Sequence, residues 1–200
     1  MDDNRLSYVT ARYPQLRGLE LLPLSLLFAC MGAYNAGLFS LPGDAAPHVA
    51  GRWLMGAFLA SLVATYPIRR WYVAHLGIAP QRIAKSQVWP LLAGAGALVL
   101  GTAIQPAVPF FNAPVALVAL LLGGFGIRDY PFRRHYIAAA AVLLTYALHR
   151  LLGVPQSAVR VFSDLSIAAA LAIVGLGDHR LLVSTLEPVN PSEQAAHAHV

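Results

Sequence analysis

The chain has 200 residues, of which 58% are hydrophobic and only 12% are charged, and its formal net charge is +5. A soluble domain carries roughly twice that share of charged residues, so the chain has too few polar side chains to cover a water-facing surface. The positive charge does not point to nucleic acid either, because no basic helix face or aromatic–basic motif occurs. This composition is typical of a protein whose main solvent is lipid.

Six apolar segments follow one another along the chain. A bilayer core of about 30 Å takes roughly 20 helical residues, and the strict two-residue alternation of a membrane barrel is absent. We therefore predict an all-α, polytopic integral membrane protein, a bundle of six transmembrane helices at 19–41, 51–68, 88–107, 112–127, 134–152 and 161–177. The bundle domain covers 19–186, with an amphipathic N-terminal segment at 1–18 and a disordered tail at 187–200.

The first apolar segment contains the single cysteine, Cys30, so a disulfide framework or a cysteine metal cluster is not expected. Residues 27–30 (LFAC) loosely resemble a lipoprotein cleavage box, but Phe28 fits poorly and the apolar run continues to Leu41, which favours a spanning helix. Asn35 is the one strongly polar side chain well inside this segment. It either bonds to a neighbouring helix, which is the favoured interpretation, or lines a solute path.

Basic residues are distributed unevenly between the two predicted sides. With six spans, the N-terminus, the 69–87 and 128–133 loops and the C-terminus share one side, which holds eleven of the fourteen Lys and Arg residues. This bias places both termini in the cytoplasm. Thirteen arginines against one lysine, with much alanine, indicate a GC-rich bacterial genome, so we expect a multi-pass protein of the bacterial inner membrane.

A short motif occurs twice on the predicted cytoplasmic side, as YPIRRWY at 66–72 and YPFRRHY at 130–136. Tyrosine and arginine at a span end are typical of anchoring at the lipid headgroups, which is the simpler interpretation. The alternative is a basic, aromatic surface that docks a partner protein or anionic lipid. That surface would comprise Arg69, Arg70, Tyr72, Arg82, Lys85, Arg133 and Arg134.

The longest predicted cytoplasmic connection, 71–87, reads WYVAHLGIAPQRIAKSQ. Apolar and polar residues are interleaved in it, and Gly77 and Pro80 divide it into two short amphipathic pieces that we expect to lie on the membrane surface. Residues 76–83 (LGIAPQRI) are similar to the cytoplasmic coupling segment of some ABC-transporter permeases. This resemblance covers about a dozen residues, and it implies docking on an ATPase partner.

Ionisable residues are rare inside the predicted spans, where they would mark function. A first polar group near the external ends of the last two spans comprises Tyr146, His149, Arg150, Arg160 and Asp164. A local Arg160–Asp164 ion pair is the simpler interpretation, and an external binding pocket with His149 as the polar contact is the alternative. Asp178 and His179 close the last span, either as a helix-end cap or as an acid–base pair acting on a phosphate or lipid headgroup. We expect no metal site and no cofactor; His197 and His199 lie in the tail.

The function that we expect is therefore a membrane-embedded subunit of a bacterial transport or translocation complex that docks a protein partner or forms a homo-oligomer. The alternatives are a structural or assembly subunit of a larger membrane complex, a stand-alone solute carrier, and an intramembrane enzyme acting on lipid-linked substrates. The absence of GxSxG, HExxH and P-loop motifs makes an enzyme the weaker expectation.

Overall fold

The computed structural model describes residues 3–13, 16–40, 47–76 and 85–186. Within these ranges, it describes the backbone but not the side chains of residues 3–5, 47–51 and 85–91. The described residues form helices and no strand. The α-helices are α1 (Asp3–Arg12), α2 (Leu22–Asn35), α3 (Pro47–Leu76), α4 (Lys85–Ile104), α5 (Ala113–Arg128), α6 (Arg134–Ala147) and α7 (Gln156–Leu186). Two 3-10 helices, η2 (Gly18–Leu21) and η3 (Gln105–Ala107), precede α2 and follow α4.

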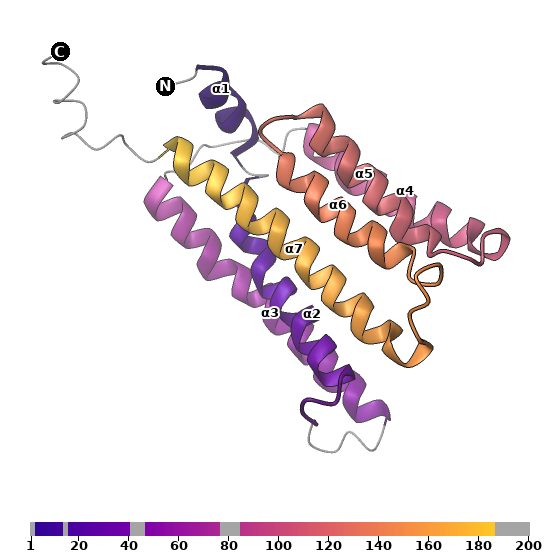
Figure 1. The fold of residues 1–200 in the computed structure, drawn as a ribbon. Coiled ribbons are helices and arrows are strands. Elements are labelled where there is room, and N and C mark those ends of the chain that lie inside the picture. Colours follow the sequence, from indigo (N-terminus) through magenta and orange to yellow (C-terminus); the bar gives the residue numbers. More distant parts are fainter. Residues whose placement is uncertain (1–2, 14–15, 41–46, 77–84, 187–200) are drawn as a thin grey trace, which may run out of the picture.

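The long helices form an open row in the spatial order α3, α2, α7, α6, α5, α4 (Figure 1). The central helix is α7, which packs against α2 and η2 on one side and against α6 on the other. The outermost helices of the row, α3 and α4, each have one main neighbour. Each of these two helices therefore keeps a broad side chain surface that the described part of the chain does not cover.

The all-α prediction is confirmed, but the prediction of six membrane spans is not. Two described segments are long and apolar enough to cross a membrane, Gly18–Asn35 and Gln156–Leu186. At about 1.5 Å per residue, the 16 residues of α5 and the 14 of α6 extend over roughly 24 and 21 Å. Both lengths are below the roughly 30 Å of a bilayer core.

Several predicted boundaries are also wrong. The fifth helix ends at Ala147 rather than at residue 152, and the last begins at Gln156 rather than at residue 161. The first helix ends at Asn35 rather than at residue 41, and Gly37 follows with a φ of +74° in the chain reversal. The second continues through Pro67 to Leu76, so that residues 71–76 are helical rather than part of a loop. The last continues nine residues beyond Gly177. In the last two cases, tertiary packing extends the helix, because Tyr72 and Leu182 are fully buried.

One end of the bundle, here called the basal end, brings together α1, the last turns of α3, the α5–α6 turn and the second half of α7. Its apolar core consists of Val9, Tyr13, Leu16, Tyr72, Leu181 and Leu182. These residues come from segments far apart in the sequence. The amphipathic helix α1 thus packs against the bundle through its apolar side.

Close backbone contact joins η2 to α7 at this end. A methyl group on Gly175 would lie 2.7 Å from the carbonyl oxygen of Gly18, and one on Gly18 would overlap the backbone of Gly175. Small residues at such crossings allow helix backbones to approach, and close packing is the main attraction between helices in lipid. The Gly18–Gly175 contact fixes the height at which α7 meets the start of α2.

Candidate functional site

The basal end contains a group of interacting polar side chains centred on two consecutive residues of α7. Asp178 is only 1% exposed. Its Oδ2 accepts a hydrogen bond of 2.8 Å from the Tyr136 hydroxyl, and its Oδ1 lies 2.9 Å from Nε2 of His135. Both partners lie at the start of α6. A buried carboxylate is costly unless it is paired and hydrogen-bonded, and these two contacts supply that pairing.

His179 faces a different helix. Its Nδ1 lies 2.9 Å from the hydroxyl oxygen of Tyr72, near the end of α3. The same oxygen accepts a hydrogen bond of 3.1 Å from the amide of Leu19. The Tyr72 hydroxyl and Nδ1 of His179 therefore share one hydrogen bond, whose donor depends on the tautomer of the imidazole. The Tyr13 hydroxyl adds a hydrogen bond of 3.3 Å to the backbone carbonyl of Tyr72.

The two copies of the repeated motif thus meet on α7. The last tyrosine of the first copy, Tyr72, bonds to His179, and the last tyrosine of the second copy, Tyr136, bonds to Asp178. The preceding residue of each copy also takes part, because His135 pairs with Asp178 and the Trp71 ring lies 6.0 Å from that of His179. We call Tyr72, His135, Tyr136, Asp178 and His179 the tyrosine clamp.

Gly177 is the reason that His135 can lie beside α7. A methyl group at position 177 would overlap the imidazole ring of His135. The His135 side chain is 15% exposed, and the carboxylate of Asp178 orients its ring. An oriented imidazole of this kind is the usual arrangement of a general base, and it is equally suited to holding two helices together.

A second buried acid, Asp129, fastens α1 to the α5–α6 turn. Its carboxylate forms ion pairs with Arg12, Arg128 and Arg133 and accepts a hydrogen bond of 3.1 Å from the Tyr8 hydroxyl. Burial by itself would raise the pKa of Asp129, but the Arg128 hydrogen bond and the charge of Arg12 outweigh it and hold the pKa below its usual value.

Aromatic stacking supports the same junction. The Tyr8 ring stacks on Phe132 with 4.6 Å between the ring centroids, and the Arg12 guanidinium lies over the Tyr8 ring, 4.5 Å from its centroid. Burial raises the pKa of Tyr8, so its hydroxyl remains a donor to Asp129. The second motif copy is therefore held from outside by α1 and from inside by α7.

The structure divides the predicted docking residues into two groups. Arg69, Arg70 and Arg134 are exposed at the basal end. Tyr72 and Arg133 are buried, since they belong to the tyrosine clamp and to the Asp129 cluster respectively. Arg82 lies outside the described residues, as does most of the segment similar to the permease coupling segment, and Lys85 begins α4 with an undescribed side chain.

The other predicted polar group lies at the opposite end and forms two separate pairs. Asn35 Nδ2 donates a hydrogen bond of 2.7 Å to Asp164, so this amide bonds to the neighbouring helix α7. Tyr146 and His149 instead stack with their centroids 5.3 Å apart on α6. The partner of Asp164 is thus an amide from α2 rather than the expected Arg160 of its own helix.

Sequence reasoning missed His135 and Tyr136, and it missed Tyr8 and Asp129. An alignment of the two motif copies pairs His135 with Trp71 and Tyr136 with Tyr72. Because Tyr72 was a predicted site residue, this alignment could have pointed to Tyr136 and its neighbour His135. Sequence reasoning also treated Asp178 and His179 as one pair with a common role. In the structure, Asp178 contacts α6 and His179 contacts α3.

Within the described part of the chain, no three His, Cys, Asp or Glu side chains gather as a metal ion would require. Comparisons with protein-family models, with curated proteins and with solved structures gave no match for this chain. The geometry of its own residues must therefore carry any statement about function.

Proposed function

We propose that the chain is a membrane-embedded structural subunit that docks a partner protein within a larger complex of the bacterial inner membrane, such as a transport or translocation complex. The observation that carries this proposal is the uncovered apolar side of α3.

The exposed side of α3 is large and consists of bulky side chains. Met55 is 60% exposed and Val63 is 71% exposed. At 100° per residue, the exposed stripe lies opposite the inward-facing residues of the helix. Its members are Met55, Phe58, Leu59, Leu62, Val63 and Tyr66. Monomeric soluble proteins rarely expose apolar patches of this extent, so such a patch marks contact with lipid or with another protein.

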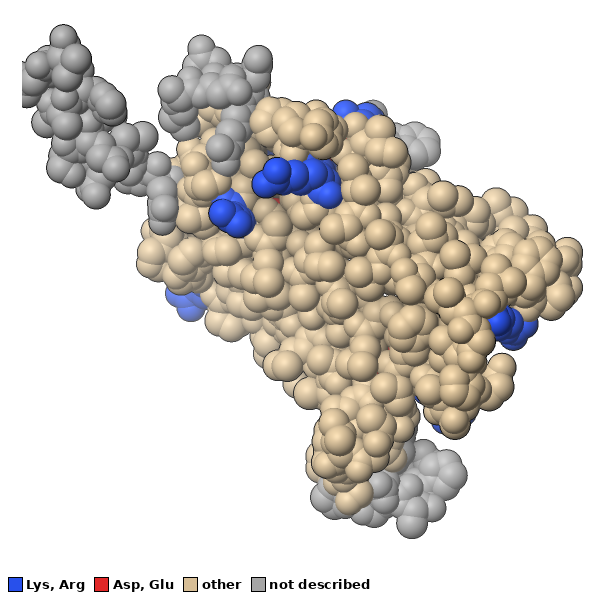
Figure 2. All heavy atoms as spheres, viewed as in Figure 1, with Lys and Arg blue, Asp and Glu red and all other residues tan. Residues whose placement is uncertain are grey.

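Helix α4, at the other end of the row, also exposes apolar side chains, since Leu98, Val99 and Leu100 are at least half exposed. On the face drawn in Figure 2, Lys and Arg side chains lie near the ends of the bundle and the middle is uncharged. An apolar middle between basic ends is the distribution that a membrane imposes. It supports embedding of the bundle in lipid.

Several polar side chains of the described bundle bond to one another across helices, which favours a scaffold over a carrier. Asp178 binds α6 to α7, Tyr72 binds α3 to α7, and Asn35 binds α2 to α7. These contacts hold α7 to three other helices. A rigid bundle with apolar outer helices is suited to presenting a fixed surface to a partner.

A photoreactive side chain at Leu59, in the exposed stripe of α3, tests the docking directly. We expect irradiation in native membranes to give an adduct of one defined protein mass. The same probe at Leu120, 63% exposed on α5, serves as the matched control and should not give this adduct. Adducts at Leu59 that contain only lipid would refute the docking proposal.

Cys30 is a built-in reporter of membrane embedding, because it is the single cysteine and its side chain is exposed in the middle of α2. A small hydrophilic maleimide should not label it in intact membranes, although a membrane-soluble maleimide should. Both reagents should react after solubilisation in SDS. Rapid labelling by the hydrophilic reagent in membranes would show that this side of α2 faces water.

The competing function is an intramembrane enzyme acting on a lipid-linked substrate, and the oriented His135–Asp178 pair favours it. Replacing His135 with Gln keeps a polar side chain of similar reach but removes the base. An enzyme would lose product formation in cells while its membrane abundance and thermal stability stayed unchanged. A structural clamp would instead lose thermal stability, and the loss would extend to the His179→Ala variant.

A further inference from the structure

The exposed side of α5 carries an apolar stripe that ends in an arginine at the basal end. Leu120, Gly124 and Ile127 are all exposed, and the exposed Arg128 follows directly. At about 100° per residue, these four positions lie within roughly 100° of one another around the helix axis, so they form one continuous face. A methyl group on Gly124 would meet no described atom within 4 Å. The stripe extends over roughly 12 Å along the helix and is open at its middle.

Arg128 binds its neighbouring carboxylate with only one nitrogen atom. Its Nε lies 3.1 Å from Oδ1 of Asp129, and its guanidinium lies 5.2 Å from the centroid of the Phe125 ring. Within the described part of the chain, the two terminal nitrogens of Arg128 have no hydrogen-bond partner, and the side chain is 61% exposed. A planar guanidinium suits the paired oxygen atoms of a phosphate. The free side of Arg128 is therefore available to an anion at the surface.

The surroundings of Arg128 carry more positive than negative charge. Three arginines form ion pairs with the single carboxylate of Asp129, namely Arg12, Arg128 and Arg133. The other described acids of the basal end, Glu20 and Asp178, have partners of their own. Figure 2 shows Lys and Arg side chains grouped at this end of the bundle. One carboxylate cannot neutralise three guanidinium groups, so the surplus charge attracts an anion.

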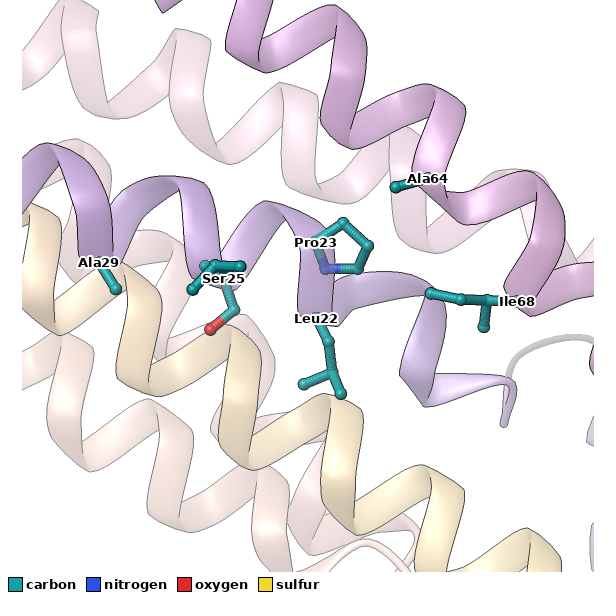
Figure 3. A pocket seen from close by; sticks show the side chains of 7 residues that line it. Leu22, Pro23, Ser25, Ala29, Ala64 and Ile68 are labelled. Carbon is teal, nitrogen blue, oxygen red and sulfur yellow. The ribbon is translucent and has the colours of Figure 1, made fainter.

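From this arrangement we propose that the exposed side of α5 binds an anionic phospholipid, with its headgroup phosphate on Arg128 and one acyl chain along Ile127, Gly124 and Leu120. The occupant is a lipid because charge and apolar stripe adjoin on one helix face, in the order in which a phospholipid presents its phosphate and its chain. The groove between α2 and α3 in Figure 3 differs, because none of its lining residues carries a charge. The inference rests on membrane embedding, although it does not depend on the proposed protein partner.

The experiment counts the phospholipids bound to the full chain in mild detergent by native mass spectrometry, with phosphatidylglycerol and phosphatidylethanolamine supplied in equal amounts. We expect the wild-type protein to bind phosphatidylglycerol in preference. Arg128→Gln should lower the ratio of bound phosphatidylglycerol to phosphatidylethanolamine about fivefold, the factor that one basic side chain near a membrane surface contributes. Arg70→Gln removes an exposed arginine of α3, on the other side of α7 in the row. It is the matched control that should keep the ratio.

Two further arms separate charge from structure and lipid from free phosphate. Asp129→Asn removes the acid that offsets the arginines, so the ratio should stay the same or rise, whereas a merely structural loosening would lower it. Washing the wild-type protein with inorganic phosphate should leave phosphatidylglycerol bound, because free phosphate has no acyl chain.

Four results would each overturn the inference: no preference in the wild-type protein, equal losses in Arg70→Gln and Arg128→Gln, a lower ratio in Asp129→Asn, or displacement of the lipid by inorganic phosphate. The Leu59 adduct of the proposed docking surface should persist in Arg128→Gln, so the two proposals fail separately.

Discussion

Replacing Asp178 with alanine removes the centre of the tyrosine clamp. The carboxylate is 1% exposed and holds Tyr136 at 2.8 Å and His135 at 2.9 Å. Hydrogen bonds to a charged group contribute about 1.5–3 kcal/mol each, so we expect D178A to lower the free energy of unfolding by about 3–5 kcal/mol. At about 2–4 °C per kcal/mol for a chain of this size, the melting temperature in mild detergent should fall by roughly 6–20 °C.

The same reasoning makes a sharper statement about Asp178 and Tyr136 together. Y136F should cost about 1.5–3 kcal/mol in the wild-type chain but little in the D178A background, because the acceptor is already gone. The double-mutant cycle should therefore give a coupling energy of about 1.5–3 kcal/mol. Y130F alters the exposed first tyrosine of the same motif and should change stability by no more than about 0.5 kcal/mol. Additive effects of D178A and Y136F in thermal unfolding would refute the clamp.

Three further changes probe other contacts by the same unfolding measurement. Gly175→Ala places a methyl 2.7 Å from the Gly18 carbonyl oxygen and should destabilise the chain by about 1–3 kcal/mol, whereas Gly124→Ala, with open space around its methyl, should be neutral or stabilising. Folding lowers the pKa of Asp129. The contribution of its carboxylate to the free energy of unfolding is therefore complete above the ordinary pKa near 4, and it is lost as the pH falls through the lower pKa of the folded state. The wild type should thus lose more stability than D129N on acidification from pH 6 to pH 3. Asn35→Ala leaves the buried Asp164 without its amide donor and should cost about 1–3 kcal/mol, and no loss would show that water replaces the amide.

The existence of the helices could be predicted from the sequence because each follows a long apolar run, and such runs have few alternatives in lipid. Their ends could not. Asp178, His179 and Arg180 resemble the end of a span at residue 177, yet α7 continues to Leu186. A polar residue after an apolar run either ends a helix in water or bonds to a neighbouring helix, and the local pattern is the same in both cases.

The candidate site was predictable only in part for a related reason. Asp178, His179 and Asn35 stand out because they are polar among apolar neighbours. Their partners depend on the order of the helices in the row, which places α6 and α3 beside α7 at the height of residues 178 and 179. That order follows from packing contacts such as Gly18 with Gly175, and no periodicity within one segment encodes it.

The two motif copies show which of their shared residues has a shared structural role. The first copy lies within the continuous helix α3, so Arg69 and Arg70 face outward while Tyr72 faces α7. The second copy includes the α5–α6 turn, so Arg133 turns inward to Asp129. The first arginine therefore differs between the copies, whereas the final tyrosine contacts α7 in both. Because these tyrosines meet consecutive residues on different sides of α7, replacing Tyr72 should loosen α3 from α7, and replacing Tyr136 should loosen α6 from α7.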